Sequence, residues 1–414
     1  MRPAQPDLPS AIEEILLLPS AQRTAAQKEQ LLLHFLTVAP DLQGERAEIA
    51  KLRSQKPAFP TTLVFEERPA SNPRVTNVHH RGEFLQPEEA VTPGVPSVLP
   101  PLPANAPSNR LSFARWLVSP GNPLVGRVTM NRQWSAFFGR GIVRSTDDFG
   151  YQGDVPTHPE LLDWLAVEFA KQNWSLKKMH RLIVMSATYR QSSQVTPNLL
   201  AQDPENRLLA RGPRVRLEAE QVRDMALTVA GLLSPKLGGP SVFPPQPPGV
   251  TSEGTYGPLA WNVSMGEDRY RRGLYTFSKR SAPYAMLQTF DGPSGEVCIA
   301  RRDVSNTPLQ ALTLLNDQVF MEASQALGKM LTTRPGTAEE KAVYLFRRCL
   351  ARPPATEEKT RIVAFYTTQK QRFEKKELDA AAVAGMGEGD PNERAAWTTL
   401  ARTLLNLDEV ITKR

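Results

Sequence analysis

The sequence contains very little cysteine. Its 414 residues include only two, Cys298 and Cys349, and neither belongs to a CxxC or CxxCH motif. A thiolate zinc cluster and an attached c-type haem both require such motifs. Both are therefore excluded for these residues, whereas a single disulfide between the two cysteines stays open, because only geometry decides it.

Long apolar runs are missing too. No stretch reaches the roughly 18 consecutive apolar residues that a membrane-spanning helix requires. The apolar run at residues 15–18 is short and follows Glu13 and Glu14, unlike the hydrophobic region of a signal peptide. From the residues alone, we expect no membrane span, no signal peptide and a protein that stays in the cytoplasm.

Positive charge is in excess, and it comes mostly from arginine. The net charge is +7, with 35 Arg against 15 Lys, and the arginines are scattered among Asp and Glu. Arg grips carboxylate, sulfate or phosphate with two hydrogen bonds, and it also forms internal ion pairs. Internal pairing on a solvated surface is the first interpretation, and a mildly basic surface for an anionic polymer is the alternative. Because no basic tail or nucleic-acid-binding motif is present, we expect no nucleic-acid partner.

The five histidines do not form a metal-binding pattern. None belongs to an HExxH motif or a paired helical ligand set, so no metal site is predicted. His79 and His80 fall on a predicted strand, where their rings would point to opposite faces. His180 is interpreted as a satisfied core histidine, and the alternative is an electron-transfer contact with a haem domain.

The stretch at residues 127–193 predicts three helices packed into a core. The first is expected to stop at Gly139. The second is expected to start after Thr157, which has the spacing of a capping box with Glu160, and the third after Ser175. Four of the six tryptophans lie close together in this part of the sequence, at Trp116, Trp134, Trp164 and Trp174.

Helical patterns return near the C-terminus. Thr307 and Pro308 are expected to open one helix that continues to Leu327, and Thr337 with Glu340 predicts a capping box. Further helices are predicted at residues 356–378 and 392–407, and a short helix with Val222 on its apolar stripe at 218–233.

Alternating and β-branched residues predict a few strands. They fall at residues 61–67 and 74–80, which are expected to pair as a hairpin, and at 272–277 and 284–290. Proline-rich connectors occupy residues 93–107 and 234–250. The predicted fold class is therefore mainly α, a multi-helical core with a few short β-strands and long Pro/Gly-rich loops.

The richest polar cluster lies within residues 267–306. Its candidate ligand-binding residues are Arg271, Tyr275, Asp291, Glu296, Arg301 and Arg302. Guanidinium groups beside aromatic rings suit a sulfated or carboxylated sugar. The alternative is a buried ion-pair network that braces the last helices. A further interpretation of this cluster is a polysaccharide-active enzyme with Asp291 and Glu296 as acid and base. This chemistry requires the two carboxyl groups to be about 5–10 Å apart.

Eleven segments, which run in order between residues 110 and 412, also carry a family resemblance. They are RLSFARWLVSPGNPLVGRVTMNRQW, FFGRGIV, DDFG, HPELLDWLAVEF, HRLIVMSATYRQSS, NRLLARGPRVRLEAEQVRD, GGPSVFPPQPPG, GEDRYRRGLYTF, TFDGPSGEVC, NTPLQALTLLND and LLNLDEVIT. Together they resemble the C-terminal domain of unknown function in the planctomycete cytochrome-c-associated proteins. With this resemblance, the chain divides into a helical spacer at 1–60, a short β-segment and Pro-rich linker at 61–107, and the helical family domain at 108–414. That domain comprises a core at 110–233, an insert of loops and strands at 234–305, and C-terminal helices at 306–407.

The resemblance implies an exported protein with a cytochrome module and a second uncharacterised domain upstream. It implies an extracytoplasmic location, in the periplasm or at the cell surface, and those upstream domains as partners. A c-type haem is then expected only on the upstream module, and no cofactor on these residues. We expect the DNA just upstream to encode, in frame, a CxxCH module and a signal peptide.

Three function hypotheses follow. The first is an accessory module that binds a partner domain or an anionic glycan. The second is the polysaccharide-active enzyme with Asp291 and Glu296, and the third is a haem-free electron-transfer partner. No catalytic residue is implied by the resemblance.

Overall fold

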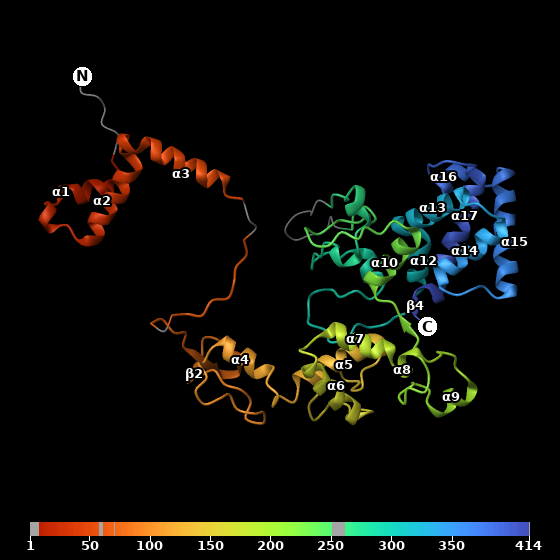
Figure 1. Cartoon of the computed structure of the whole chain (residues 1–414), viewed down its shortest axis with the longest axis horizontal. Helices are drawn as coiled ribbons and strands as arrows, with labels where there is room; N and C mark the ends of the chain where they lie inside the picture. Colours follow the sequence, from red (N-terminus) through yellow and green to blue (C-terminus); the bar gives the residue numbers. More distant parts are fainter. Residues whose placement is uncertain (1–7, 58–60, 70, 251–260, 414) are drawn as a thin grey trace, which may run out of the picture. The chain divides into compact units, whose positions relative to one another are not determined.

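The computed structural model describes residues 8–57, 61–69, 71–250 and 261–413, and it is mainly helical (Figure 1). These residues form seventeen α-helices and only two small two-stranded sheets, so the predicted fold class is confirmed. Within the described ranges, no helix combines the length and the apolar character needed to cross a membrane. The chain divides into two compact units, Met1–Thr92 and Pro93–Arg414.

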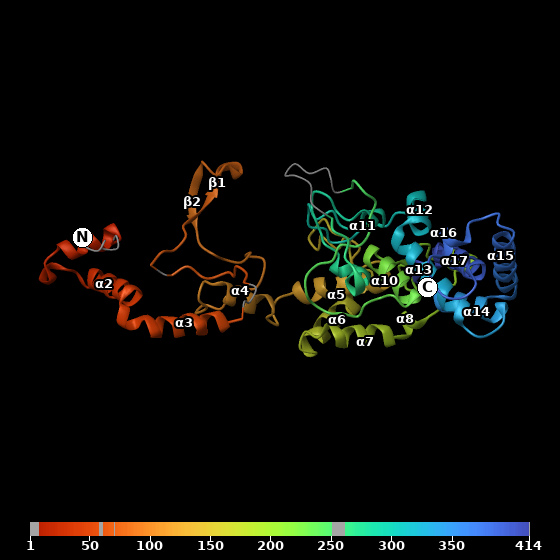
Figure 2. The same cartoon turned by 90° about the horizontal axis from the view of Figure 1, so that it is seen from above.

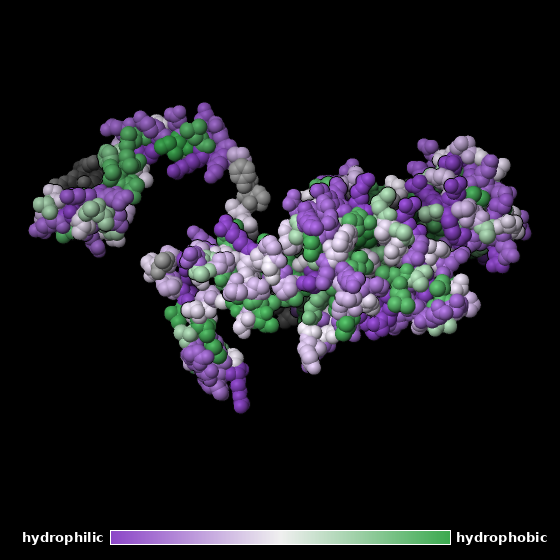
Figure 3. Space-filling view, turned by 60° about the horizontal axis from the view of Figure 1, so that its bottom comes forward, coloured by the Kyte–Doolittle hydropathy of each residue, from purple (hydrophilic) through white to green (hydrophobic). Residues whose placement is uncertain are grey.

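The first unit contains three helices and one hairpin. The helices are α1 (Ser10–Leu17), α2 (Ala25–Val38) and α3 (Gln43–Gln55). Helix α2 opens with a capping box between Thr24 and Gln27, which satisfies two backbone donors at its start. Several apolar side chains of these helices are exposed, among them Leu32, Leu33 and Phe35, and Figure 3 shows hydrophobic residues gathered among hydrophilic ones in this unit.

The prediction that residues 61–67 pair with residues 74–80 in a hairpin is wrong. Strand β1 (Thr76–His79) pairs antiparallel with β2 (Pro87–Val91), and residues 61–67 form no strand. Strands β1 and β2 are joined by a short turn, whereas Pro69 and Pro73 stand between 61–67 and β1. The 80–86 connection is closed by backbone hydrogen bonds from His80 N to Gln86 O and from Glu83 N to His80 O, whereas the two prolines supply no N–H donor.

The second unit begins with a core built from three helices. Its helices up to residue 202 are α4 (Arg110–Leu117), α5 (Val125–Phe138), α6 (Pro159–Lys171), α7 (Leu176–Met185), α8 (Ala187–Arg190) and α9 (Pro197–Gln202). Met130 of α5, Leu165 of α6 and Met179 of α7 are almost completely buried against one another, and Figure 2 shows the three helices side by side. They form the first core.

The ends of the helices in this core can be compared with the predicted caps. Helix α5 ends at Gly139, whose φ of +75° suits glycine, and the Ser175 side chain accepts a hydrogen bond from Lys178 N at the start of α7. Both predictions are confirmed. The capping box at Thr157 is wrong, because α6 begins after His158 without a side-chain cap. The Thr157 hydroxyl instead donates to the carbonyl of Ile142.

The second and larger core contains the remaining helices. They are α10 (Ala219–Ala230), α11 (Ala285–Thr289), α12 (Pro308–Asn316), α13 (Gln318–Thr333), α14 (Ala338–Leu350), α15 (Thr356–Glu374), α16 (Ala380–Ala384) and α17 (Pro391–Leu405). Helix α10 follows the first core in sequence, yet its buried Val222 and Ala226 belong to the second core (Figure 1). The single helix predicted from Pro308 to Leu327 is two helices, because Asp317 caps α13.

The strands predicted at 272–277 and 284–290 are wrong. Gly273–Tyr275 is a 3₁₀ turn, and residues 285–289 form α11. Among the described residues, the backbone pairing between the Pro/Gly-rich segment and this region is limited to isolated parallel bridges, Ser234 with Arg271 and Val242 with Thr276. Proline supplies no N–H donor, so a continuous ladder cannot form along that segment. The second sheet lies elsewhere and pairs β3 (Val215–Arg216) with β4 (Thr412–Lys413).

Buried arginines brace the irregular segments. Arg394 is 5% exposed and donates to backbone carbonyls in the 385–389 loop, and Arg271 is 1% exposed and donates to carbonyls in the 236–240 loop. A guanidinium carries five donors in a planar fork, which suits several carbonyls at once. Part of the arginine excess is therefore internal, with backbone oxygens as partners.

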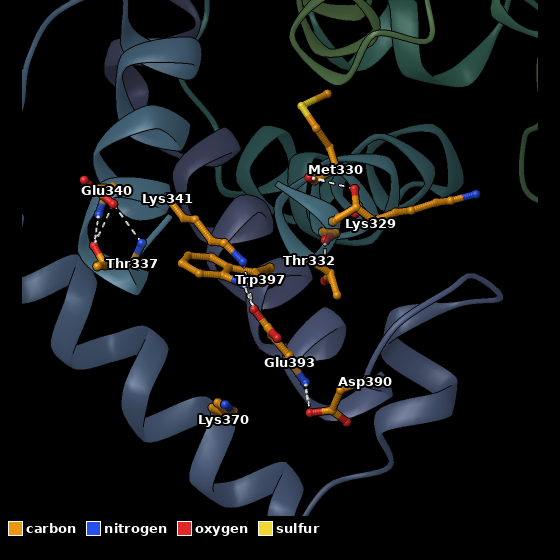
Figure 4. A network of polar contacts seen from close by, with 12 residues as sticks. Lys329, Met330, Thr332, Thr337, Glu340, Lys341, Lys370, Asp390, Glu393 and Trp397 are labelled. Carbon is orange, nitrogen blue, oxygen red and sulfur yellow. Dashed lines mark hydrogen bonds and ion pairs between the residues drawn. The ribbon is translucent and has the colours of Figure 1, made fainter. Parts of the chain in front are cut away.

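Polar contacts also join the last helices (Figure 4). The predicted capping box between Thr337 and Glu340 is confirmed at the start of α14. From that helix, Lys341 Nζ lies 3.2 Å from Glu393 Oε1 of α17, and the same oxygen accepts a hydrogen bond from Trp397 Nε1 at 3.1 Å. This shared carboxylate fixes α14 against α17.

Candidate functional site

A cleft of about 840 Å³ opens in the second unit. Its walls come from the end of α5, from β3 with the start of α10, and from residues 290–304. The charged residues of the lining are Arg132, Arg216, Glu218, Asp291, Arg301, Arg302 and Asp303. We call this the arginine cleft, because four of these seven side chains are guanidinium groups.

Arg302 is fixed in the wall of the arginine cleft. Its two terminal nitrogens lie 2.5 and 3.0 Å from the two carboxylate oxygens of Glu220, and it is 3.4 Å from Glu218. Burial would raise the pKa of Glu220, but the hydrogen bonds from Arg302 outweigh that effect and the pKa lies below its usual value. This bidentate pair anchors the 299–304 segment to the start of α10.

The other three arginines of the cleft are not paired. The side chains of Arg132, Arg216 and Arg301 form no hydrogen bond or ion pair with any residue in the described ranges, and Arg216 Nε is buried without a partner. Of the three carboxylates in the lining, Glu218 pairs with Arg302, and Asp291 is held by Ser305. Unpaired guanidinium groups therefore outnumber unpaired carboxylates, and the cleft is suited to an anion.

Asp291 lines the cleft, but its carboxylate already accepts hydrogen bonds from Ser305. Its Oδ1 accepts from Ser305 Oγ at 2.7 Å, and its Oδ2 accepts from Ser305 N at 2.9 Å. Its φ of +61° lies in the left-handed region, which Asp tolerates better than most residues. Glu296 is exposed and does not line the cleft. The structure therefore does not bring these two carboxyl groups together there as an acid and base pair.

Arg271 and Tyr275 form a separate cluster. The Arg271 guanidinium lies 3.7 Å from the centre of the Tyr275 ring and donates to backbone carbonyls of the 236–240 loop, and Tyr275 Oη accepts from Gly238 N. Neither side chain lines the arginine cleft. Their position matches the bracing alternative rather than the predicted ligand pocket.

His180 lies on α7, in the first core. Its Nε2 is 2.7 Å from Gln133 Oε1, and its ring meets that of Phe137 edge-on at 5.2 Å. The ring is half-buried. These contacts are those of a satisfied core histidine.

No metal centre is evident in the part of the chain that the structure describes, because no three His, Cys, Asp or Glu side chains gather closely enough there. The cysteines are both free: Cys298 is exposed, and Cys349 is buried in the second core. Burial raises the pKa of the Cys349 thiol to about 12. Because both thiols are free, Cys298 and Cys349 form no disulfide.

We expect the two thiols to differ in reactivity at pH 8. An Ellman titration of the native protein should detect one thiol per chain quickly, from Cys298. Cys349 should react at least about a thousandfold more slowly, since it is almost entirely protonated and must wait for the core to open. Denaturant should release the second equivalent, and Cys298→Ser should remove the fast phase. Equal rates for both thiols would contradict the burial of Cys349.

Sequence reasoning found only part of the arginine cleft. It identified Arg301, Arg302 and Asp291, and it missed Arg132, Arg216 and the Glu220 partner. A weak signal was present in RVRLEAE, where Arg214 and Arg216 alternate as on a strand just before a helix. No local signal connects Arg132 of α5 to the cleft, because only the fold brings it there.

A comparison with known families gives a match within the second unit. Residues 109–366 match the model of a family described as "Protein of unknown function (DUF1553)". This span is more than half of the chain and contains all four arginines of the cleft. No curated protein and no solved structure matches the chain.

Proposed function

The chain belongs to the DUF1553 family of proteins of unknown function, and from that premise we propose that its arginine cleft binds an anionic glycan. The module would act by binding rather than by catalysis. Carboxylated or sulfated sugars carry planar or trigonal anions, which a guanidinium fork grips with two parallel hydrogen bonds.

The observation that carries this proposal is the group of three arginines without a protein partner. Arg132, Arg216 and Arg301 come from three separate segments and line one cleft. A charged group that loses water without gaining a partner is unfavourable, and the buried Nε of Arg216 is in that position. An anion in the cleft would supply the missing acceptors.

We further propose that the chain is the C-terminal domain of a planctomycete cytochrome-c-associated protein. The ordered segments from RLSFARWLV to LLNLDEVIT support it. In that setting the module would work outside the cytoplasm, next to upstream domains of which one carries the haem. Sequencing the DNA upstream of codon 1 tests this proposal: an in-frame CxxCH module with a signal peptide supports it, and an upstream stop codon without either contradicts it.

Replacing Arg301 or Arg216 by alanine is expected to weaken glycan binding by about tenfold each. The reason is that a hydrogen bond to a charged group contributes about 1.5–3 kcal/mol, and about 1.4 kcal/mol corresponds to tenfold in affinity. Titration calorimetry with heparin and with polygalacturonate gives the dissociation constants. Raising the salt concentration should weaken binding further.

Arg361→Ala is the matched control. It removes the same charge from α15, where the side chain is 82% exposed and pairs only loosely with Glu357. Glycan affinity of this variant should equal that of the wild type. If Arg301→Ala and Arg216→Ala also match the wild type, or if neither glycan binds, the proposed function is wrong. An isolated upstream domain that binds the cleft in place of the glycans would favour the partner-domain alternative.

A further inference from the structure

We infer that the ligand is an extended chain of acidic sugars rather than a single anionic sugar. This inference rests on the proposed function and concerns the same site. It starts from the observation that the arginine cleft does not end at Arg301. A second depression of about 380 Å³ shares Ile299, Ala300, Arg301 and Asp303 with it.

The series of depressions continues beyond that shared wall. Arg144 and Asp154 line both the second depression and a small third one of about 40 Å³. The third shares Arg140, Ile142 and Glu205, among others, with a fourth of about 310 Å³. We call these four depressions together the furrow. Because each one shares wall residues with the next, the four depressions adjoin one another in a series.

Unpaired guanidinium groups occur in all four depressions, and over the whole furrow they outnumber the unpaired carboxylates among the described residues, Asp147, Asp154 and Asp303, which gather at the second depression. Besides those of the three arginines of the arginine cleft, the side chains of Arg144 and Arg207 have no hydrogen bond or ion pair among the described residues, and they line the second to fourth depressions. The other arginines of the lining are in use: Arg302 with Glu220, Arg140 with Glu205, Arg214 with Asp408, and Arg211 with backbone carbonyls. One sugar would meet one or two of the five free guanidinium groups, whereas a chain would meet all of them.

The electrostatics near Glu205 agree with a surplus of positive charge at that end. The pKa of this carboxyl lies below its usual value, first because of its hydrogen bond with Arg140, with Arg144 and Arg207 adding to the effect. At the third depression two carboxylates, Glu205 and Asp154, lie beside three guanidinium groups. Further anionic groups of a ligand would be attracted to the same place.

The last depression also offers an apolar wall. Leu200, which is 53% exposed, lines it, and the stacked rings of Trp134 and Phe138, whose centroids are 4.2 Å apart, border it although these residues are only 6% and 7% exposed. Sugar rings present C–H faces that pack on such surfaces while their acidic groups reach charged neighbours. Cationic and apolar groups in one depression suit an acidic saccharide unit better than a small inorganic anion.

The test compares heparin-derived oligosaccharides of two lengths with the full chain by titration calorimetry. We expect a decasaccharide to bind at least about tenfold more tightly than a disaccharide. Arg144→Ala and Arg207→Ala should weaken decasaccharide binding about fivefold, as expected for one exposed charge contact, and leave disaccharide binding unchanged. Arg301→Ala should weaken both ligands. Arg361→Ala is again the control, and unchanged melting temperatures show that each variant is folded.

The possible outcomes separate the two proposals. If both lengths bind equally and Arg144→Ala behaves like the control while Arg301→Ala still weakens binding, the extended chain is overturned and the proposed function stands. If neither length binds, the proposed function itself is overturned. If a DNA oligonucleotide of equal charge binds as tightly as the decasaccharide, with the same loss in Arg144→Ala, the assignment to a glycan is overturned.

Discussion

Replacing Gly328 by alanine is expected to destabilise the second unit by about 2–3 kcal/mol. In an open helix the same change would stabilise by up to about 1 kcal/mol, because alanine has the higher helix propensity. Gly328 lies in α13 where that helix crosses α17. A β-carbon at this position would lie 2.2 Å from Thr398 Oγ1, 2.9 Å from Arg394 O and 3.0 Å from Thr398 N.

The steric overlap outweighs the gain in helix propensity, because the residues around Gly328 cannot move away. Thr398 is completely buried and its hydroxyl donates to the carbonyl of Arg394, so rotating it breaks a buried hydrogen bond. The backbone of α17 would have to shift instead. Next to it, Trp397 is also fully buried, with its ring 3.7 Å from that of Tyr366. The tight packing of protein interiors transmits such a shift.

Urea denaturation followed by circular dichroism measures the loss as a lower midpoint. Gly44→Ala in α3 is the control, because a β-carbon there meets nothing within 4 Å, and the second unit should keep its midpoint. The double variant Gly328→Ala/Thr398→Ala removes the closest contact and should recover part of the loss. A Gly328→Ala protein more stable than the wild type would show that the helices do not approach this closely.

Arg394→Ala should destabilise the second unit by about 3–5 kcal/mol, which makes it the substitution with the largest expected effect. The guanidinium donates to the carbonyls of Gly385, Gly387, Glu388 and Gly389. It is buried, and no described carboxylate forms an ion pair with it. Without it, four carbonyls that face the core lose their donor, since the tight loop cannot supply another.

The Arg394→Lys variant distinguishes the contribution of the positive charge from the contribution of the planar set of guanidinium donors. Lysine keeps the charge but offers three donors on one nitrogen, so it should recover less than half of the stability. Hydrogen exchange in the 385–389 loop should become faster in both variants. Arg361→Ala, on an exposed part of α15, should change the stability by less than about 0.5 kcal/mol. If Arg394→Lys is as stable as the wild type, the fork of donors is not what holds the loop.

The sequence predicted those parts of the fold that depend on near neighbours. Ser175, Thr337 and Gly139 mark helix ends through contacts within a few residues, and all three predictions are confirmed. Predictions that needed distant partners were wrong. Thr157 has the pattern of a cap, but its hydroxyl binds Ile142 O, fifteen residues away, and α11 has the pattern of a strand.

The candidate site shows the same limit. The sequence indicates where arginines are abundant, but it does not indicate what each guanidinium contacts. Arg271 binds carbonyls, Arg302 binds Glu220, and Arg301 binds no described residue, although all three lie within about thirty residues of one another. These differences depend on loops that approach from other parts of the chain. They become visible only when the fold is known.

The position of α10 has a consequence for the order in which the protein folds during synthesis. Its buried face packs against α11 and α13, and α13 ends at Thr333. At about 5–20 residues per second, a ribosome needs roughly five to twenty seconds to make the chain between α10 and the end of α13. The first core, by contrast, is closed by helices that follow one another directly. We therefore expect the first core to fold while the chain is still growing, and α10 to wait with its apolar face uncovered, as a site for a chaperone, until α13 emerges.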